Sequence, residues 1–331
     1  MLLRLRHRIE HAFYILGKTL FRVLPKPMRL YLGKLLGGIG FYLDRRHRKV
    51  ALDNLHLAYP DSSDRECLDI AHQCFENFGR LLSDVLGSSG LDREKTSKRF
   101  EVEGWHHLEV AEARNRGFMV LTGHLGHWEA VAQYLALTGR QVSFVARPLD
   151  NPLMERDLRR IRERFGNHTV LKRSAARGVL RALRSKGRVG IVMDQRVNPN
   201  EGKAYPFFGS PAYTTSMPAR ISIRTGAPAV PVFGIPIDGW KRVRIIIRPP
   251  IYPDDYTGDT ESRIDSLTTR YLEIMETMIR DHPHLWLWMH RRWRQYPDWP
   301  YNGRVDRQIA NSKAIQDSPA SEALPRSSRQ T

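Results

Sequence analysis

The sequence predicts an α/β protein with a mostly parallel central sheet flanked by helices and with a helical extension at its N-terminus. Up to about residue 87, apolar residues recur at helical spacing, and Pro25, Pro27 and Pro60 interrupt the pattern. From Gly117 onward, short apolar runs alternate with segments of helical period, which is typical of βαβ units. A hydrophobic content of 41% with 27% charged residues is that of a folded protein.

Each element is predicted from its own pattern. The early helices are expected at 5–23, 28–43, 44–57 and 63–87, and Ser63 or Asp64 is the expected cap of the last one. Strands are expected at 118–121, 142–146, 189–193, 229–235 and 243–247. Helices are expected between and after them at 127–137, 152–165, 175–185 and 217–225.

The chain shows no internal repeat and no obvious linker before the tail, so a single domain with an N-terminal helical extension is expected. Residues 1–60 are expected to form an amphipathic, membrane-associating helical segment, and residues 61–310 the α/β domain. Residues 311–331 are rich in Ser, Ala and Gln without apolar periodicity, and this composition predicts a disordered tail.

The charge points to an anionic partner or surface, because the formal net charge is +18 and the pI is near 10.2. Residues 1–50 hold twelve Lys/Arg and two acidic residues, interleaved with apolar and aromatic ones. This pattern favours a segment lying in a membrane interface, the alternative being a solvated helical pair packed on the core. The longest clean apolar run, at 35–43, has nine residues against the ~20 of a spanning helix, which leaves a tilted span as the other mode of attachment.

Two further features bear on compartment and on rival functions. No secretory signal is evident, and the two cysteines, Cys67 and Cys74, are too few for a disulfide scaffold, which indicates a reducing, cytoplasmic compartment. Basic residues also crowd 156–188, so a nucleic-acid-binding protein is an alternative, but no zinc-finger, RNP or OB pattern accompanies them. A non-catalytic lipid-binding scaffold is a third hypothesis.

The residues that carry chemistry are expected beyond the carboxyl ends of the strands, where α/β sheets bind ligands. In the string GHLGHWE at 123–129, His124 follows a buried strand through Gly123, and Glu129 lies five residues on, in the first turn of a helix. A carboxylate that fixes one ring nitrogen leaves the other to take a proton from a hydroxyl, which is general-base catalysis.

Spacing alone is weak support, because His107 and Glu112 have the same separation. The alternative for His124 is a capping or core imidazole. His124, His127 and Glu129 also suggest metal ligands, but HxxHxE lacks the i,i+4 histidine pair of zinc helices, so no metal is expected.

The order of motifs resembles a known family. Its blocks are DRRHRKVALDNLHLAYP at 44–60, GHLGHWE, ARP at 146–148, MDQR at 193–196, YPFFG at 205–209, PVF at 231–233 and HLWLWMHRRW at 284–293. Together they resemble the bacterial lipid A biosynthesis (lauroyl/myristoyl) acyltransferases, within the lysophospholipid acyltransferase superfamily, from about residue 5 to about residue 298.

The resemblance implies transfer of an acyl group from an acyl carrier protein thioester to a hydroxyl, or a hydroxyacyl chain, of a lipid A precursor at the cytoplasmic face of the inner membrane. The expected partners are acyl carrier protein, anionic inner-membrane lipid and the lipid A precursor, with no nucleic acid and no cofactor. Acyl-CoA as donor, a phosphatidylinositol mannoside or lysophospholipid as acceptor, and the oligomeric state stay open.

The same resemblance assigns the residues. It implies His124 as general base, Glu129 as the carboxylate that orients it, and Arg147 and Asp194 in the second and third blocks. Backbone N–H groups around 125–127 and the Arg147 cation are expected to stabilise the oxyanion, whereas Arg147 as a surface cation and Asp194 as a turn cap are the plainer readings.

The remaining candidates are assigned by their blocks. Gly123, Arg196, Phe207 and Gly209 are further substrate-binding candidates, although an aromatic before glycine also packs loops onto a core. The tryptophans and arginines at 286–293 are expected either at a lipid interface or in the core. His127 stands where the family leads us to expect a less titratable residue such as Asn, and it has no assigned role.

Overall fold

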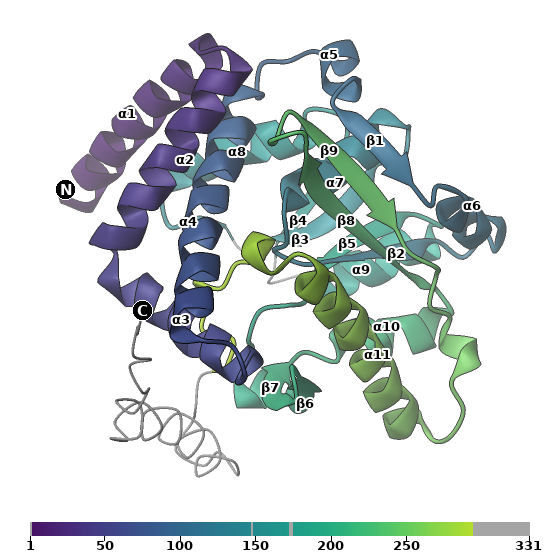
Figure 1. Ribbon diagram of the computed structural model, residues 1–331. Coiled ribbons are helices and arrows are strands. Elements are labelled where there is room, and N and C mark those ends of the chain that lie inside the picture. The colour runs from purple at the N-terminus through teal and green to yellow at the C-terminus, as the bar shows by residue number, and fades with distance from the viewer. Residues whose placement is uncertain (1, 147, 172–174, 294–331) are drawn as a thin grey trace, which may run out of the picture.

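A computed structural model describes residues 2–146, 148–171 and 175–293 (Figure 1). Arg147 and the tail at 311–331 therefore lie outside the described residues. The four early helices are present, and Ser63 caps α4 through a capping box with Glu66. Their bounds are α1 Leu2–Val23, α2 Lys26–Leu43, α3 Arg45–Ala58 and α4 Asp64–Gly87.

A seven-stranded, mostly parallel sheet follows, which confirms the predicted fold class. Its order is β1-β9-β8-β2-β5-β3-β4, and only the β8–β9 pairing within it is antiparallel. The strands are β1 Phe100–Glu103, β2 Phe118–Thr122, β3 Val142–Ala146, β4 His168–Leu171, β5 Arg188–Val192, β8 Ala229–Ile237 and β9 Arg242–Ile247. A separate hairpin pairs β6 Lys203–Phe207 with β7 Ser210–Thr214.

Helices cover both faces of the sheet (Figure 1). They are α5 Arg93–Ser97, α6 His106–Ala113, α7 Trp128–Leu137, α8 Pro152–Glu163, α9 Ala175–Arg184, α10 Met217–Thr225 and α11 Thr260–Asp281. The sequence analysis did not predict α5, α6 or α11, nor the strands β1, β4, β6 and β7. For α11 the signal was present, because Ile264, Leu267 and Tyr271 recur at helical spacing and are buried.

The core has two parts, one on each face of the sheet. Along β2 the side chains alternate, so that Phe118 and Val120 pack beneath α6 and α7 while Met119 and Leu121 face the other cluster. That second cluster also contains Leu30 of α2 and Leu55 of α3. The N-terminal helices therefore share a core with the sheet and are not a separate appendage.

Helices α2 and α4 lie side by side and touch through glycines (Figure 1). A Cβ on Gly79 would lie 2.1 Å from the Gly33 carbonyl oxygen, and one on Gly37 would lie 2.2 Å from the Phe75 carbonyl oxygen. Contact between main chains at this distance requires residues without side chains. In the described ranges, no helix is long and apolar enough to cross a membrane.

This contact predicts the effect of adding one methyl group. Gly79→Ala should destabilise the fold by about 2 kcal/mol, because the backbone of α2 has to move. Gly17→Ala on α1, where a Cβ meets nothing within 4 Å, should instead stabilise slightly through helix propensity. Thermal unfolding of the two variants checks this, and an equal effect at both positions would contradict the close contact.

Candidate active site

The GHLGHWE loop joins β2 to α7, and two glycines allow it to lie on its neighbours. A Cβ on Gly123 would meet Met275 Sδ of α11 at 2.5 Å and Asp194 Oδ2 at 3.1 Å. Gly126 has a φ of +58°, and a Cβ there would lie 2.4 Å from the Gly234 oxygen of β8. Gly123 thus serves the packing that brings His124 to Asp194.

His124 is held by Asp194, which follows β5 at the same edge of the sheet. Its Nδ1 lies 2.9 Å from Asp194 Oδ1, and its backbone N–H donates to Oδ2 at 2.7 Å. Trp286 Nε1–H donates to the same Oδ2 at 2.8 Å. Asp194 is 1% exposed, so a buried carboxylate fixes the orientation of the imidazole.

The two groups shift each other's pKa in opposite directions. Burial lowers the pKa of His124, but the charge and hydrogen bond of Asp194 outweigh it and the pKa is raised above its ordinary value. Burial alone would raise the pKa of Asp194, yet His124 and Trp286 lower it to about 2. Asp194 is therefore ionised and stabilises the protonated imidazole.

The expectation that Glu129 orients His124 differs from the structure. Glu129 accepts a two-pronged hydrogen bond from Arg162 of α8, with Arg162 Nε 3.0 Å from Oε2. Burial raises the pKa of Glu129, but Arg162 lowers it below its ordinary value. Glu129 acts on His124 through its charge, and Asp194, which the sequence analysis left between holding a residue and capping a turn, makes the hydrogen bond.

Asp194 holds His124 at Nδ1, which leaves Nε2 as the second ring nitrogen. The His124 side chain is 23% exposed, and Nε2 lies 3.4 Å from the Gln195 side-chain nitrogen, a contact long enough for a substrate hydroxyl to replace. The Trp128 ring lies edge-on at 5.1 Å. The ring thus has one nitrogen held by a carboxylate and the other beside a neutral side chain, an arrangement that general-base catalysis can use.

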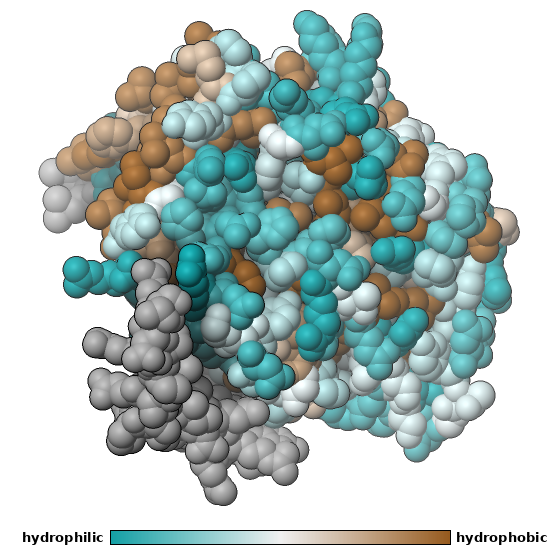
Figure 2. Space-filling view, in the orientation of Figure 1, coloured by the Kyte–Doolittle hydropathy of each residue, from teal (hydrophilic) through white to brown (hydrophobic). Residues whose placement is uncertain are grey.

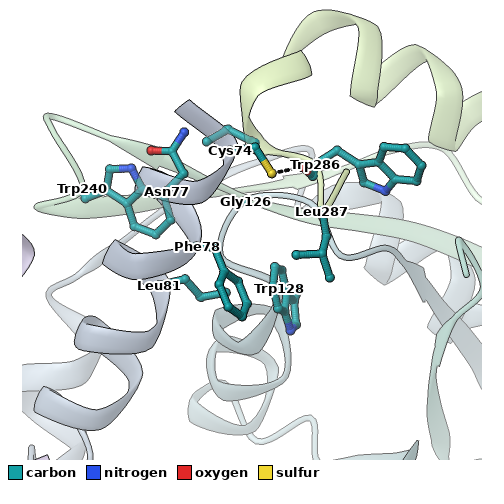
Figure 3. A pocket seen from close by; sticks show the side chains of 10 residues that line it. Cys74, Asn77, Phe78, Leu81, Gly126, Trp128, Trp240, Trp286 and Leu287 are labelled. Carbon is teal, nitrogen blue, oxygen red and sulfur yellow. Dashed lines mark hydrogen bonds between the residues drawn. The ribbon is translucent and has the colours of Figure 1, made fainter. Parts of the chain in front are cut away.

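Behind Trp128 lies a small apolar cavity of about 10 Å³, room for one water molecule. Figure 3 shows Phe78 and Leu81 of α4 on one side of Trp128 and Leu287 on another. A cavity of this size does not hold a fatty chain in this conformation. A groove of about 400 Å³ lies between α11 and the segment at 248–256, in which Ile251 pairs with Ala229 at the start of β8.

The expected oxyanion donors are partly engaged elsewhere. The Gly126 N–H donates to the Leu285 oxygen at 3.0 Å and the His127 N–H to the Gly234 oxygen at 2.7 Å. These two amides consequently hold the loop and do not face a substrate. Arg147 lies outside the described residues, and Arg162 is the described cation whose charge acts on His124, lowering its pKa.

The other candidates lie around this centre with different roles. Phe207 is fully buried and packs against Trp286 and Trp293, so it supports the site from behind and does not border a ligand surface. Gly209, with a φ of +69°, forms the turn between β6 and β7. Arg196 is half-buried two residues after Asp194.

The C-terminal block belongs to the core. Trp286, Trp288 and Arg292 are at most 2% exposed, and Arg292 donates to the Tyr213 carbonyl oxygen and the Thr214 hydroxyl. Burial lowers the pKa of His290 to about 4. Of the two expectations for this block, core packing is the one that these residues meet.

Three functional contacts were missed from the sequence: Arg162 on Glu129, Gln195 beside His124, and Trp286 on Asp194. Trp286 stood in a motif block and Arg162 on a predicted helix, but no periodicity indicates which partner a side chain finds across the fold. Within the described ranges, no three His, Cys, Asp or Glu side chains gather as metal ligands do.

An imidazole fixed by a buried carboxylate at the carboxyl edge of an α/β sheet has the geometry that general-base catalysis of acyl transfer to a hydroxyl requires. Residues 2–295 match the family described as bacterial lipid A biosynthesis acyltransferase. The chain belongs to this family and is an acyltransferase of the O-acylating type.

Individual relatives are distant. The chain is 27% identical over 278 residues to the lipid A biosynthesis palmitoleoyltransferase of Escherichia coli, covering 83% of this chain and 87% of the relative. It is 25% identical over 280 residues to the lauroyltransferase of the same organism, covering 83% and 88%. It is 23% identical to the phosphatidylinositol mannoside acyltransferase of Mycobacterium tuberculosis, covering 66% and 68%.

The His124–Asp194 contact predicts a pH effect. A general base acts when neutral, so activity should rise with pH through the raised pKa of His124. Asp194→Asn removes the charge that raises this pKa and leaves burial, so the acid limb should move to lower pH while the maximal rate falls about 10²-fold. Measurements of the rate as a function of pH check this prediction.

Asp53→Asn is the control, because it breaks only an exposed pair with Lys49, and it should leave the acid limb of the profile in place. An unmoved acid limb in Asp194→Asn would refute the pairing of His124 with Asp194.

Proposed function

We propose that the protein transfers a fatty acyl group from an acyl carrier protein thioester to a hydroxyl of a lipid A precursor, at the cytoplasmic face of the inner membrane. The observation that carries the proposal is the His124 imidazole, oriented by Asp194 at Nδ1 and open at Nε2. Membership of the family supports the acceptor class. The basic, apolar N-terminal helices support the location.

The chemistry follows from this geometry. His124 Nε2 takes the proton of the acceptor hydroxyl as its oxygen attacks the thioester carbonyl carbon, and Asp194 stabilises the imidazolium that forms. The tetrahedral intermediate then breaks its C–S bond, and the departing thiolate takes the proton back from the imidazolium. The ester and the free thiol are the products.

The oxyanion needs a positive partner, and we assign this role to Arg162. Glu129 holds its guanidinium, and both side chains lie largely buried, at 23% and 15% exposure. In a site of low dielectric a fixed cation acts strongly on developing negative charge. Glu129 is then a positioning residue for Arg162 and not for His124.

A mass-spectrometric assay tests the reaction. Purified protein is incubated with acyl carrier protein bearing a fatty acyl group and, separately, with a lipid A precursor or a phosphatidylinositol mannoside as acceptor. We expect a mass gain of one acyl group on the lipid A precursor. A mass gain on the phosphatidylinositol mannoside alone would identify that lipid as the acceptor, in line with the mycobacterial relative. No mass gain on either acceptor would refute the proposal.

Two substitutions locate the chemistry. His124→Ala should lower the rate about 10³-fold, because the base is lost, and Glu129→Ala should lower it about 10²-fold, because Arg162 loses its anchor. His107→Ala is the matched control, since His107 also precedes a glutamate by five residues but stands in α6, where Glu112 pairs with Arg140 and Arg188. Full activity in His124→Ala would overturn the site.

The N-terminal helices support attachment at a membrane interface. The exposed large apolar side chains of α1 and α2 include Phe13, Leu16, Tyr31 and Leu43, which are 70%, 67%, 69% and 77% exposed. Figure 2 shows an apolar band over these two helices. Such a face enters the acyl boundary while Lys and Arg reach the lipid phosphates, at about 1 kcal/mol for each basic residue.

Vesicle binding tests this attachment. The double variant Phe13→Glu and Leu16→Glu should bind vesicles containing phosphatidylglycerol about 10-fold more weakly in a sedimentation assay, because it places two carboxylates on the apolar face. Val110→Glu on α6, a residue that is 51% exposed, should bind as the unaltered protein does. Equal binding by all three proteins would exclude α1 as the contact.

A further inference from the structure

A second imidazole–carboxylate pair lies in the same loop, three residues beyond His124. His127 Nε2 is 3.1 Å from Asp84 Oδ2 of α4, and the two residues are 2% and 0% exposed. Both side chains are closed off from solvent, so the pair affects the site only through the loop that carries His127.

Asp84 is tied to more than His127. Arg29 of α2 donates to its Oδ1 at 3.0 Å, and Arg99, in the segment before β1, donates to its Oδ2. The Lys26 ammonium lies 3.9 Å from Oδ1. Burial raises the pKa of Asp84, but His127, Arg99 and Lys26 lower it well below its ordinary value, so the carboxylate is ionised and joins three parts of the fold.

The main chain of the loop is fastened at His124 and at His127. The His127 backbone N–H donates to Gly234 of β8, and the His124 carbonyl oxygen accepts from the Leu287 N–H at 3.1 Å. Trp128, the next residue, touches the His124 ring. The His127 side chain adds a contact between this loop and α4, through Asp84.

We propose that His127 and Asp84 are positioning residues for the acyl transfer: their buried contact fixes the start of α7 and, through Trp128 and the loop, the place of His124 beside Asp194. This rests on the proposed function of the site. A displacement of about 1 Å at a reacting group costs on the order of 10²-fold in rate. Arg29 extends the same tie to the N-terminal helices.

His127 is the residue to change. Replacing Asp84 would leave Arg29 and Arg99 without their buried counter-charge, a loss that threatens folding itself. His127→Phe keeps an aromatic ring of somewhat larger size and removes the donor. His127→Gln keeps an N–H donor at nearly the place of Nε2 and is the conservative variant.

We expect His127→Phe to lower kcat about 30-fold with KM for both substrates within about twofold, because no substrate contact is lost. His127→Gln should restore kcat to within about threefold. Val85→Ala is the stability control: Val85 follows Asp84 and is 6% exposed, so its truncation destabilises the fold without changing the His127–Asp84 pair. This variant should leave kcat unchanged at temperatures below its melting transition.

A second readout does not depend on activity. The charged groups that face His124, namely Asp194, Glu129, Arg162 and His290, are all retained in these variants. NMR titration of the isotopically labelled His124 ring should show a lower pKa in His127→Phe because the ring has moved from Asp194, and His127→Gln controls for the loss of the His127 charge that acts on Glu129. Val85→Ala and His127→Gln should titrate as the unaltered protein.

The outcomes are distinct. If His127→Phe leaves both kcat and the His124 titration unchanged, the positioning role is refuted. If the unaltered protein transfers no acyl group but the His124 titration still shifts in His127→Phe, the proposed function fails while the positioning of His124 by His127 stands.

Discussion

The site depends on a single buried contact, the one between the His124 ring and Asp194. It joins the end of β2 to the end of β5, which are neighbours in the sheet although 70 residues apart in the chain. Because Asp194 is almost fully buried, solvent screens its charge little, and this charge raises the pKa of the imidazole. Trp286 completes the arrangement by donating to the oxygen that the His124 backbone also uses.

Around that contact the protein arranges charge in separate buried pairs. Glu129 holds Arg162, and Asp84 gathers His127, Arg29 and Arg99. Each carboxylate serves its own cation or ring, so the two histidines of the loop do not compete for one partner. Pairs of this kind contribute less to stability than to a unique arrangement, because the cost of desolvation offsets most of the attraction.

Much of the scaffold could be predicted from the sequence, because its signals are local. The apolar run at 142–146 is the strand β3, and Met217–Thr225 is the predicted helix at its expected bounds. The short edge strands β1 and β4 escaped prediction because four residues carry little periodicity, and FEVE at 100–103 is half charged. The sheet order, with β9 reversed beside β8, depends on contacts that no local pattern encodes.

The location of the candidate site could be predicted from the sequence, but the hydrogen-bond partners of its side chains could not. His124 was found because glycine and strand surround it, and the HxxxxE spacing suggested Glu129 as its partner. The choice between Glu129 and Asp194 depends on where α8 places Arg162, which captures Glu129. A motif records which residues occur together, whereas the hydrogen bonds depend on the neighbours that the fold supplies.

The glycine contact between α2 and α4 has a practical consequence for preparing the protein. Deleting α1 and α2 to reduce aggregation or membrane binding would remove Arg29 from Asp84 and expose the main chain of α4 at Gly79 to water. Truncation before α3 therefore damages the interior of the remaining domain. Solubility is better sought by changing outward side chains of α1, such as Phe13, than by shortening the chain.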